Sequence, residues 1–328
     1  MTWRGQVLIE GHLTIAAQAT VSVSPGTTVR FRSTAEGVEG LLLVRGRLQA
    51  VGTPEKPVLF TADGIDPAPD DWQGILFLDS SKKNLLEWCR VEAAATGVDA
   101  EYSDLTMRNT TISRSRTGVA IRSSSGVITG GGVTDCTTGF TCAFGDADVE
   151  DIRLSGNFRG IVITGGSLFL SASEVTASQG NGIEASGARL RLEGNKVTRN
   201  GAGLVLKECR GDVVSNGIEE NRTYGLDLTD APLRIIGNWI TGNGEAGVMI
   251  RAGGGTLWDN TLRGNGGYEL INAGPEEVVA PGNWWGSADL AEVRGRIKEG
   301  CADRSCGRVT LAPLLTGPPS SGPRQSAD

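Results

Sequence analysis

Apolar and polar residues alternate in short runs that return at a nearly fixed interval along the chain. One and three residues after a recurrent glycine the chain is apolar, as at Val98 and Ala100, whereas the second and fourth positions are mixed and largely polar, as at Asp99 and Glu101. A period of two predicts a β-strand with one buried face and one exposed face, and excludes a helical repeat. The recurrent glycines are Gly97, Gly118, Gly139, Gly160, Gly182, Gly203, Gly225 and Gly247.

Successive glycines in this series are 21 or 22 residues apart. A regular period of this length is typical of a solenoid, in which each unit buries its apolar face against the next unit. The unit is too short for a strand and a long helix, and its Gly and Asn residues mark tight turns. We therefore predict an all-β, right-handed parallel β-helix with three short strands per turn and about 4.8 Å between turns. A leucine-rich horseshoe has a similar period, but its Leu-x-x-Leu-x-Leu signature is absent.

Asparagines recur with the same period in two rows. Stacked in register, each side-chain amide can donate to the neighbouring turn, and Asn tolerates the left-handed backbone of a sharp corner. Asn109 and Cys89 match the first row and Asn157 and Cys136 match the second, so we expect Cys to replace Asn at two corners. The rows are Asn195, Asn216, Asn238, Asn260 and Asn283, and Asn200, Asn221, Asn243 and Asn265.

Several segments resemble the pectate-lyase-like superfamily of right-handed parallel β-helices, and more narrowly the bacterial β-helix repeat proteins of the cell surface and periplasm. Residues 2–11, 13–15 and 24–31 look like the opening turns of those proteins, and residues 282–286, Gly-Asn-Trp-Trp-Gly, look like their closing motif. Residues 48–53, 57–61 and 72–75 continue the match. The resemblance covers nearly the whole chain. It implies the fold and a secreted, periplasmic or cell-surface location, and says almost nothing about activity.

The pattern divides the chain into four regions. We expect N-terminal β-helix turns over 1–80, regular repeats over 81–286, a C-terminal cap over 287–316 and a disordered tail over 317–328. In the cap, Leu290, Val293 and Ile297 fall on one helical face between residues 290 and 298, which predicts a short helix over the open end of the solenoid. Cys301 and Cys306 predict a disulfide that pins the cap and favours an oxidising compartment.

Composition narrows the classes of partner. The 48 glycines and 5% aromatic residues fit thin turns around a narrow core. A formal net charge of −7 argues against nucleic acid or an anionic membrane held by charge. No apolar segment is long enough to span a bilayer. No signal-peptide pattern is visible either, so we interpret the start as a mature or recombinant boundary, with a cytoplasmic protein as the alternative.

Charged residues on the polar face are candidates for chemistry. Calcium-dependent pectate lyases, as the resemblance implies, place carboxylates on the outward side of one sheet, with an Arg or Lys that abstracts a proton. Alternating charges on adjacent strands are equally expected from simple ladder pairing. The outward candidates are Asp99, Glu101 and Arg122, and then Glu184, Lys207, Asp227 and Arg251. A loop offers weak calcium candidates, although its spacing fits no EF-hand: Asp63, Asp66, Asp70 and Asp71.

Two tryptophans give a hint of binding. Counted from the asparagine row, Trp239 and Trp258 should both point outward from adjacent turns. Exposed indole rings can stack on the apolar face of a sugar, so the pair predicts a platform for carbohydrate. The alternative is that the tail, the cap or a partner subunit covers both rings.

Two functions remain open. The first is an exported, non-catalytic scaffold or carbohydrate-binding module whose partner is a polysaccharide, a cell-envelope glycan or a protein. The second is a polysaccharide lyase or glycoside hydrolase acting on acidic glycans, which requires at least three carboxylates and a basic residue on one outward patch; no catalytic residue can be assigned. No cofactor is expected apart from calcium. A copper-delivery accessory is less well supported, because one His and three Met offer few ligands.

Overall fold

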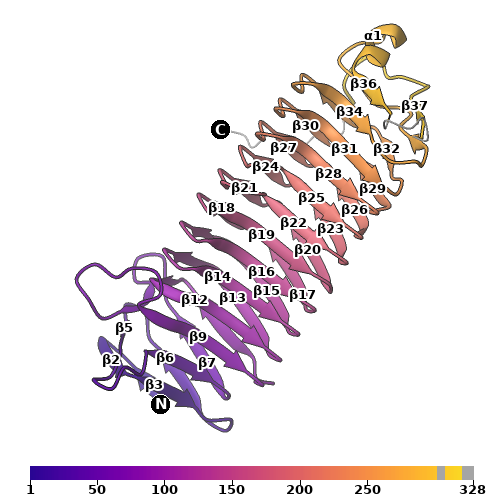
Figure 1. Cartoon of the computed structure of the whole chain (residues 1–328). Coiled ribbons are helices and arrows are strands. Elements are labelled where there is room, and N and C mark those ends of the chain that lie inside the picture. The colour runs from indigo at the N-terminus through magenta and orange to yellow at the C-terminus, as the bar shows by residue number, and fades with distance from the viewer. Residues whose placement is uncertain (301–306, 320–328) are drawn as a thin grey trace. The chain divides into compact units, whose positions relative to one another are not determined.

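The computed structural model describes residues 1–300 and 307–319, and the chain divides into two compact units, Met1–Val162 and Ile163–Asp328. Within each unit, short strands stack in parallel rows (Figure 1). Each strand pairs with a strand about one repeat later: Asp99 pairs with Ala120 in unit 1, and Val205 pairs with Asp227 in unit 2. The predicted parallel β-helix is therefore confirmed.

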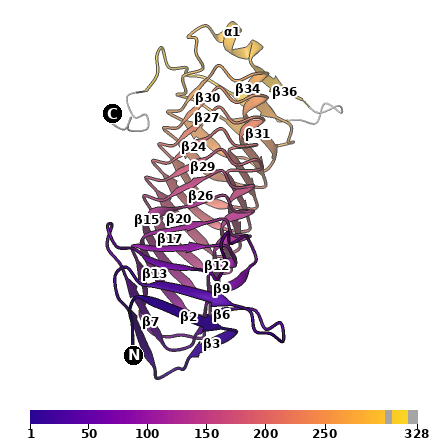
Figure 2. The same cartoon turned by 90° about the vertical axis from the view of Figure 1, so that its left-hand side faces the viewer.

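Unit 1 contains the longer strands and the longer loops between them (Figure 2). Its second sheet, called sheet B here, is the parallel series β3, β6, β9, β12, β14 and β16. The strands are β1 (Thr2–Trp3), β2 (Gln6–Glu10), β3 (His12–Ile15), β4 (Thr20–Val23), β5 (Thr28–Arg32), β6 (Leu41–Val44), β7 (Arg47–Val51), β8 (Val58–Ala62), β9 (Trp72–Leu78), β10 (Asn84–Glu87), β11 (Cys89–Glu92), β12 (Ala94–Glu101), β13 (Asp104–Ser113), β14 (Thr117–Arg122), β15 (Ser125–Thr134), β16 (Thr138–Ala143), β17 (Asp146–Glu150), β18 (Arg153–Ser155) and β19 (Arg159–Thr164), which contains the boundary between the units.

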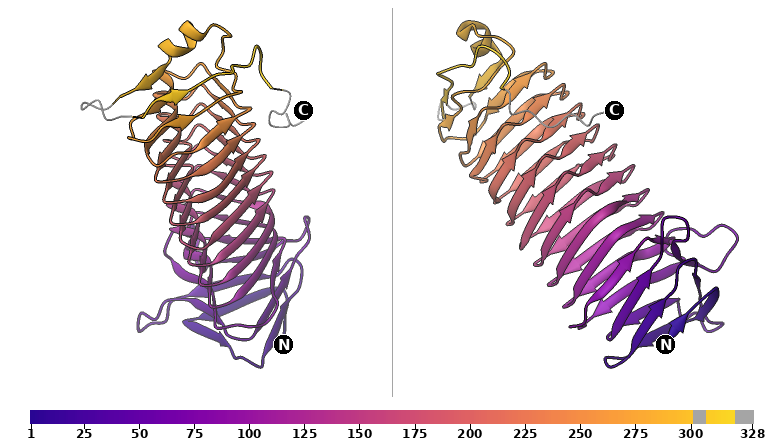
Figure 3. Two further views of the ribbon diagram at one scale, coloured as in Figure 1. Left: turned by 90° about the vertical axis from the view of Figure 1, so that its right-hand side faces the viewer. Right: turned by 180° about the vertical axis from the view of Figure 1, so that it is seen from behind.

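Unit 2 has three short strands in each regular turn, for example β22, β23 and β24. Its turns stack in the part of the chain that is coloured from pink to yellow in Figure 3. Its sheet B is the parallel series β22, β25, β28, β31, β34 and β36. The elements are β20 (Ser167–Ser171), β21 (Glu174–Thr176), β22 (Ile183–Ser186), β23 (Arg189–Glu193), β24 (Lys196–Thr198), β25 (Leu204–Lys207), β26 (Arg210–Val214), β27 (Gly217–Glu219), β28 (Tyr224–Thr229), β29 (Leu233–Ile236), β30 (Trp239–Thr241), β31 (Ala246–Ala252), β32 (Thr256–Trp258), β33 (Thr261–Arg263), β34 (Tyr268–Asn272), β35 (Val278–Val279), α1 (Leu290–Gly295), β36 (Ile297–Glu299) and β37 (Val309–Thr310).

The apolar rows form the core of each unit. Val98 and Ala100 are buried in unit 1, and Leu226 and Leu228 are buried in unit 2, as the alternation predicts. A steric constraint explains why glycine recurs at this position of the repeat. A Cβ atom on Gly225 would lie 2.6 Å from the carbonyl oxygen of Gly247 and 2.8 Å from Nδ2 of Asn243. The space of a side chain is thus already filled by the next turn.

Both predicted asparagine ladders form in unit 2. Except at the end of each row, Nδ2 of an Asn donates to Oδ1 of the Asn one turn later, as from Asn216 to Asn238 at 3.0 Å. In unit 1, Cys136 N donates to Oδ1 of Asn157 at 2.9 Å, which places this cysteine in a ladder as predicted. The prediction for Asn109 was wrong. Thr110 occupies the ladder position and accepts from Cys89 N, while Asn109 has a left-handed φ of 46°.

The cap differs in part from the prediction. The helix α1 is shorter than expected, because it ends at Gly295 and residues Ile297–Glu299 form β36, which pairs with β34. Asp289 caps the helix by accepting from the N–H groups of Ala291 and Glu292. Among the described residues, no helix has the length and apolar character to cross a bilayer. The predicted disulfide between Cys301 and Cys306 lies outside the described residues.

Candidate functional site: a tyrosine groove on sheet B of unit 2

Asp227 and Arg251 are the two predicted ligand residues that the structure brings into direct contact. Nε and Nη2 of Arg251 each donate to one oxygen of Asp227, both at 2.8 Å. The Asp227 side chain is 13% exposed, so the carboxylate is largely covered by its partner. The hydrogen bond that Arg251 donates to this carboxylate raises the pKa of Arg251, so the guanidinium stays charged.

The other two charged candidates lie on the same sheet with separate partners. Glu184 occupies the register row of Val205 and Asp227, and accepts from Nδ2 of Asn181 at 3.2 Å. Nζ of Lys207 lies 3.5 Å from the adjacent carboxylate of Glu208. Neither residue reaches the Asp227–Arg251 pair by a direct contact among the described residues.

The two tryptophans of the predicted platform differ in how far they are exposed. Trp258 is 47% exposed, whereas Trp239 is half-buried and its Nε1 atom is buried without a partner. Trp258 pairs with Ile236 and Trp239 pairs with Thr261, so the two rings belong to different strand rows. No stacking contact between them occurs in the described part of the chain.

The four loop aspartates each have a different partner. Asp63 pairs with Arg32 at 2.6 Å, Asp66 lies 3.7 Å from Arg114, Asp70 lies 3.1 Å from Arg116, and Asp71 accepts from the N–H group of Ala68. These carboxylates do not converge. Over residues 1–300 and 307–319, no group of three or more His, Cys, Asp or Glu side chains is arranged to hold a metal ion.

Two tyrosines that the sequence analysis missed flank a groove beside the Asp227–Arg251 pair. Tyr224 on β28 pairs with Ala246 on β31, which in turn pairs with Tyr268 on β34. Since neighbouring strands are about 4.8 Å apart, the two tyrosine backbones lie about 9.6 Å apart with only a small side chain between them. Both rings line a cavity of about 640 Å³, together with Met249, Ile271 and Lys298.

A cation lies over each tyrosine ring of this groove. Cζ of Arg251 is 5.8 Å from the ring centroid of Tyr224, and Nζ of Lys298 is 5.6 Å from that of Tyr268, both within the range of a cation–π interaction. A hydrogen bond with Glu245 raises the pKa of Tyr224. No carboxylate lies within ion-pair distance of Lys298 in the described ranges. The groove therefore combines two aromatic rings with one paired cation, Arg251, and one cation, Lys298, that is unpaired over residues 1–300 and 307–319.

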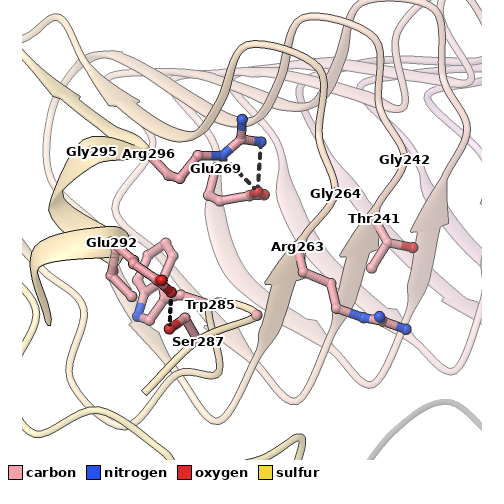
Figure 4. A pocket seen from close by; sticks show the side chains of 12 residues that line it. Thr241, Gly242, Arg263, Gly264, Glu269, Trp285, Ser287, Glu292, Gly295 and Arg296 are labelled. Carbon is pink, nitrogen blue, oxygen red and sulfur yellow. Dashed lines mark hydrogen bonds and ion pairs between the residues drawn. The ribbon is translucent and has the colours of Figure 1, made fainter. Parts of the chain in front are cut away.

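A larger cavity of about 820 Å³ lies beside α1, and two pairs of its polar side chains contact each other (Figure 4). Glu269 is buried and accepts from Nη2 of Arg296 at 2.8 Å. Ser287 Oγ donates to Oε2 of Glu292 at 2.5 Å. These contacts explain how the cap is fixed to the last turns better than they explain recognition of a ligand.

In unit 1 the structure brings Asp99, Glu101 and Arg122 together. Nη2 of Arg122 contacts Oδ2 of Asp99 and lies 3.9 Å from Oε2 of Glu101. Although Asp99 belongs to the outward row, its side chain is only 10% exposed. Burial raises the pKa of Asp99 to about 6, while the charge of Arg122 acts in the opposite direction. Asp99 and Glu101 supply two carboxylates beside Arg122, and Glu39 lines the same cavity as Asp99 and Arg122.

Comparison with solved structures supports the fold. A mutant of the periplasmic alginate epimerase AlgG matches with a TM-score of 0.63 and 15% identity over 96% of this chain and 78% of that chain. The A-module of the Azotobacter vinelandii mannuronan C-5 epimerase AlgE6 matches with a TM-score of 0.57 and 15% identity over 92% and 91% of the two chains. A search of curated proteins finds no match.

Family comparison is more specific. Residues 3–113 match the pectate-lyase-like β-helix domain. Residues 89–289, more than half of the chain, match the family described as periplasmic copper-binding protein (NosD). The expected membership of the β-helix repeat proteins is thus confirmed, and the chain belongs to the NosD family.

Proposed function

We propose that this chain is an exported, non-catalytic β-helix protein that binds a polysaccharide in the tyrosine groove of unit 2. The observation that carries the proposal is the pair of rings at Tyr224 and Tyr268, which flank one cavity from the same register position two strands apart. A pyranose ring has an apolar face that an aromatic side chain covers well, and polar groups at the edge fix its orientation.

The charges around the groove favour a sugar with an acidic group. Lys298 carries a positive charge that is unpaired among the described residues, whereas Arg251 is neutralised by Asp227. An ammonium group beside an aromatic ring can bind a carboxylate on a sugar that stacks on the ring. Alginate is a reasonable first probe, because one structurally similar epimerase is named for alginate and another for mannuronan.

Binding without turnover is the function that these contacts support best. A general acid or base must have a proton-transfer atom within reach of the substrate. Both oxygens of Asp227 already accept from the guanidinium of Arg251. Glu245 is engaged with the phenol of Tyr224. The lyase alternative is tested by the same experiment as the binding function.

The family is described as copper-binding, but the described residues do not fit a copper site. Cys89, Cys136, Cys142 and Cys209 are all buried, and burial raises the pKa of Cys89 to about 12. A thiolate is the form that binds a metal, so these thiols are poor ligands. The single histidine, His12, belongs to no group of three or more His, Cys, Asp or Glu side chains that could hold a metal ion in the described ranges. We therefore propose no function of unit 2 that depends on copper.

The location follows the family and its relatives. The family is described as periplasmic, and the AlgG epimerase is named as periplasmic. We infer an exported protein of the bacterial envelope. Detection of the native protein in a periplasmic fraction of its host would test this, and its recovery with the cytoplasm would contradict it.

The function is tested by screening the purified chain against labelled alginate, polygalacturonate and neutral polysaccharides, with calcium and then with chelator. We expect retention of an acidic polysaccharide and no rise in the absorbance of unsaturated products. The double variant Tyr224→Ala, Tyr268→Ala should lose retention. Tyr102→Ala is the matched control, because Tyr102 is an exposed ring of unit 1. Retention that survives in the double variant would refute the groove, and product formation would establish the lyase.

A further inference from the structure

A carboxylate on sheet B of unit 1 has an oxygen atom without a hydrogen-bond partner. Oδ2 of Asp99 contacts Arg122, but Oδ1 is buried and unpaired over the described ranges. The register neighbours of Asp99 are Leu76 on β9 and Ala120 on β14, and neither side chain can donate. Burying a polar atom without a hydrogen-bond partner costs free energy of folding, so this oxygen needs a physical explanation, such as a bound group.

The same residue lines a cavity of about 610 Å³, a size that is usual for small-molecule sites. Part of its polar wall is already ordered, because Nε2 of Gln73 donates to Oε2 of Glu39. The lining combines apolar and polar side chains: Val38, Leu41, Ile75 and Leu76, with His12, Glu39, Gln73, Thr96, Asp99 and Arg122.

The charge of this cavity differs from that of the tyrosine groove. Glu39 and Asp99 contribute two carboxylates against the one guanidinium of Arg122, and Glu101 adds a further carboxylate near that guanidinium. An acidic sugar would meet like charge here. A neutral sugar instead presents hydroxyl donors to the carboxylates and an apolar ring face to Leu41 and Leu76.

We propose that this cavity binds a neutral saccharide unit, with a sugar hydroxyl donating to Asp99 and the apolar face of the ring against Leu41 and Leu76. Because Oδ1 of Asp99 has almost no free surface, the sugar takes space now filled by the Arg122 side chain. That side chain is 48% exposed and can turn toward Glu101. The site lies within unit 1 and does not depend on the function proposed for unit 2.

Binding at this site should depend on pH. Arg122 and Glu101 are the charged groups that act on Asp99, and His12 and Glu39 line the same cavity. Burial raises the pKa of Asp99 to about 6. A hydroxyl donor favours the ionised carboxylate, so affinity should fall as the pH drops below about 6. The fall should disappear when Asp99 is replaced by Asn.

The test measures affinity for chitobiose and mannobiose as neutral probes and for an oligomannuronate as the acidic probe. We expect at least one neutral disaccharide to bind, with at least tenfold weaker binding in Asp99→Asn and no change in Tyr102→Ala, which alters an exposed ring of unit 1 outside the cavity lining. Thermal unfolding checks that both variants fold. The proposal is overturned if neither disaccharide binds, or if Asp99→Asn binds as well as the wild type. It is also overturned if the Tyr224→Ala, Tyr268→Ala variant abolishes the same signal.

Discussion

Asn265 donates its side-chain amide to the buried carboxylate of Glu269 at 2.5 Å, and this contact closes the second asparagine ladder. Each amide in the ladder donates one hydrogen bond to a side chain nearer the C-terminus, as from Asn221 to Asn243 at 3.0 Å, and another to a backbone carbonyl on the preceding turn. The aligned donors end on a negative charge, which strengthens the last hydrogen bond. Arg296 then pairs with the other oxygen of Glu269 at 2.8 Å. The ladder therefore ends in an ion pair rather than an open amide.

Replacing this carboxylate should destabilise the C-terminal turns of unit 2. Glu269→Gln keeps the shape and loses the charge, and we expect it to cost about 1–2 kcal/mol of unfolding free energy. Glu269→Leu also leaves the amide of Asn265 and the guanidinium of Arg296 without their acceptor, which should cost about 3 kcal/mol. Denaturant unfolding followed by circular dichroism gives the values. Equal stability of Glu269→Leu and the wild type would show that the cap does not need this pair.

Replacing an asparagine inside a ladder should lower the free energy of unfolding far more than replacing an asparagine at a similar corner outside the ladder. Nδ2 of Asn238 donates to Val213 O and to Oδ1 of Asn260, and its own Oδ1 accepts from Asn216. We expect Asn238→Ala to cost about 3 kcal/mol. Asn109→Ala should cost about 1 kcal/mol, because it loses only the tolerance of Asn for left-handed backbone. The ratio of the two unfolding free energies is the readout, and similar costs would contradict the ladder account.

The repeat glycine should tolerate no side chain. In Gly225→Ala the new methyl group would meet backbone and ladder atoms within 3 Å, and we expect a loss of about 2–3 kcal/mol. Gly295 has open space around it and no left-handed φ, so Gly295→Ala is a suitable control with a change near zero. Melting temperatures of the two variants compare them directly. A stable Gly225→Ala protein would mean that the turns can move apart.

The buried carboxylate in unit 1 should make stability depend on pH. Because the folded pKa of Asp99 is raised to about 6 from an ordinary value of 3.8, the folded state binds the proton more tightly than the unfolded state. The contribution of this group to stability is therefore present at low pH and is lost as the pH rises through 6, by about 1–3 kcal/mol in total. Asp99→Asn should gain stability relative to the wild type between pH 4.5 and 7.5. A stability difference that stays constant over this range would contradict the raised pKa.

The fold could be predicted from the sequence because its signals are periodic. Glycines equivalent to Gly225 recur from Gly97 to Gly247, and asparagines equivalent to Asn243 recur from Asn200 to Asn265. The Asn243 amide fills the space that the missing side chain of Gly225 leaves. Thr110 was not predicted as a ladder residue because its hydroxyl accepts the hydrogen bond that an Asn amide would accept. The neighbouring Asn109 was assigned to the ladder instead, one residue too early in the sequence.

The candidate site was harder to predict because it is not periodic. Asp227 and Arg251 could be found as opposite charges in an outward row. Tyr224 and Tyr268 are two turns apart, and Ala246 occupies the same position on the turn between them. The tyrosines therefore do not recur on every turn. A search for aromatic residues separated by two repeats would have found this pair. The burial of Asp99 depends on how Arg122 and nearby side chains pack, which the alternation of polar and apolar residues does not specify.

Calorimetric titration of an oligomannuronate into the wild type and into the Tyr224→Ala, Tyr268→Ala variant tests the central claim most directly, with Tyr102→Ala as the control. The account predicts binding by the wild type and by the control, and an affinity at least tenfold weaker in the double variant, because each ring contributes about 1 kcal/mol or more when it covers a sugar. Equal affinity of the double variant and the wild type would contradict it.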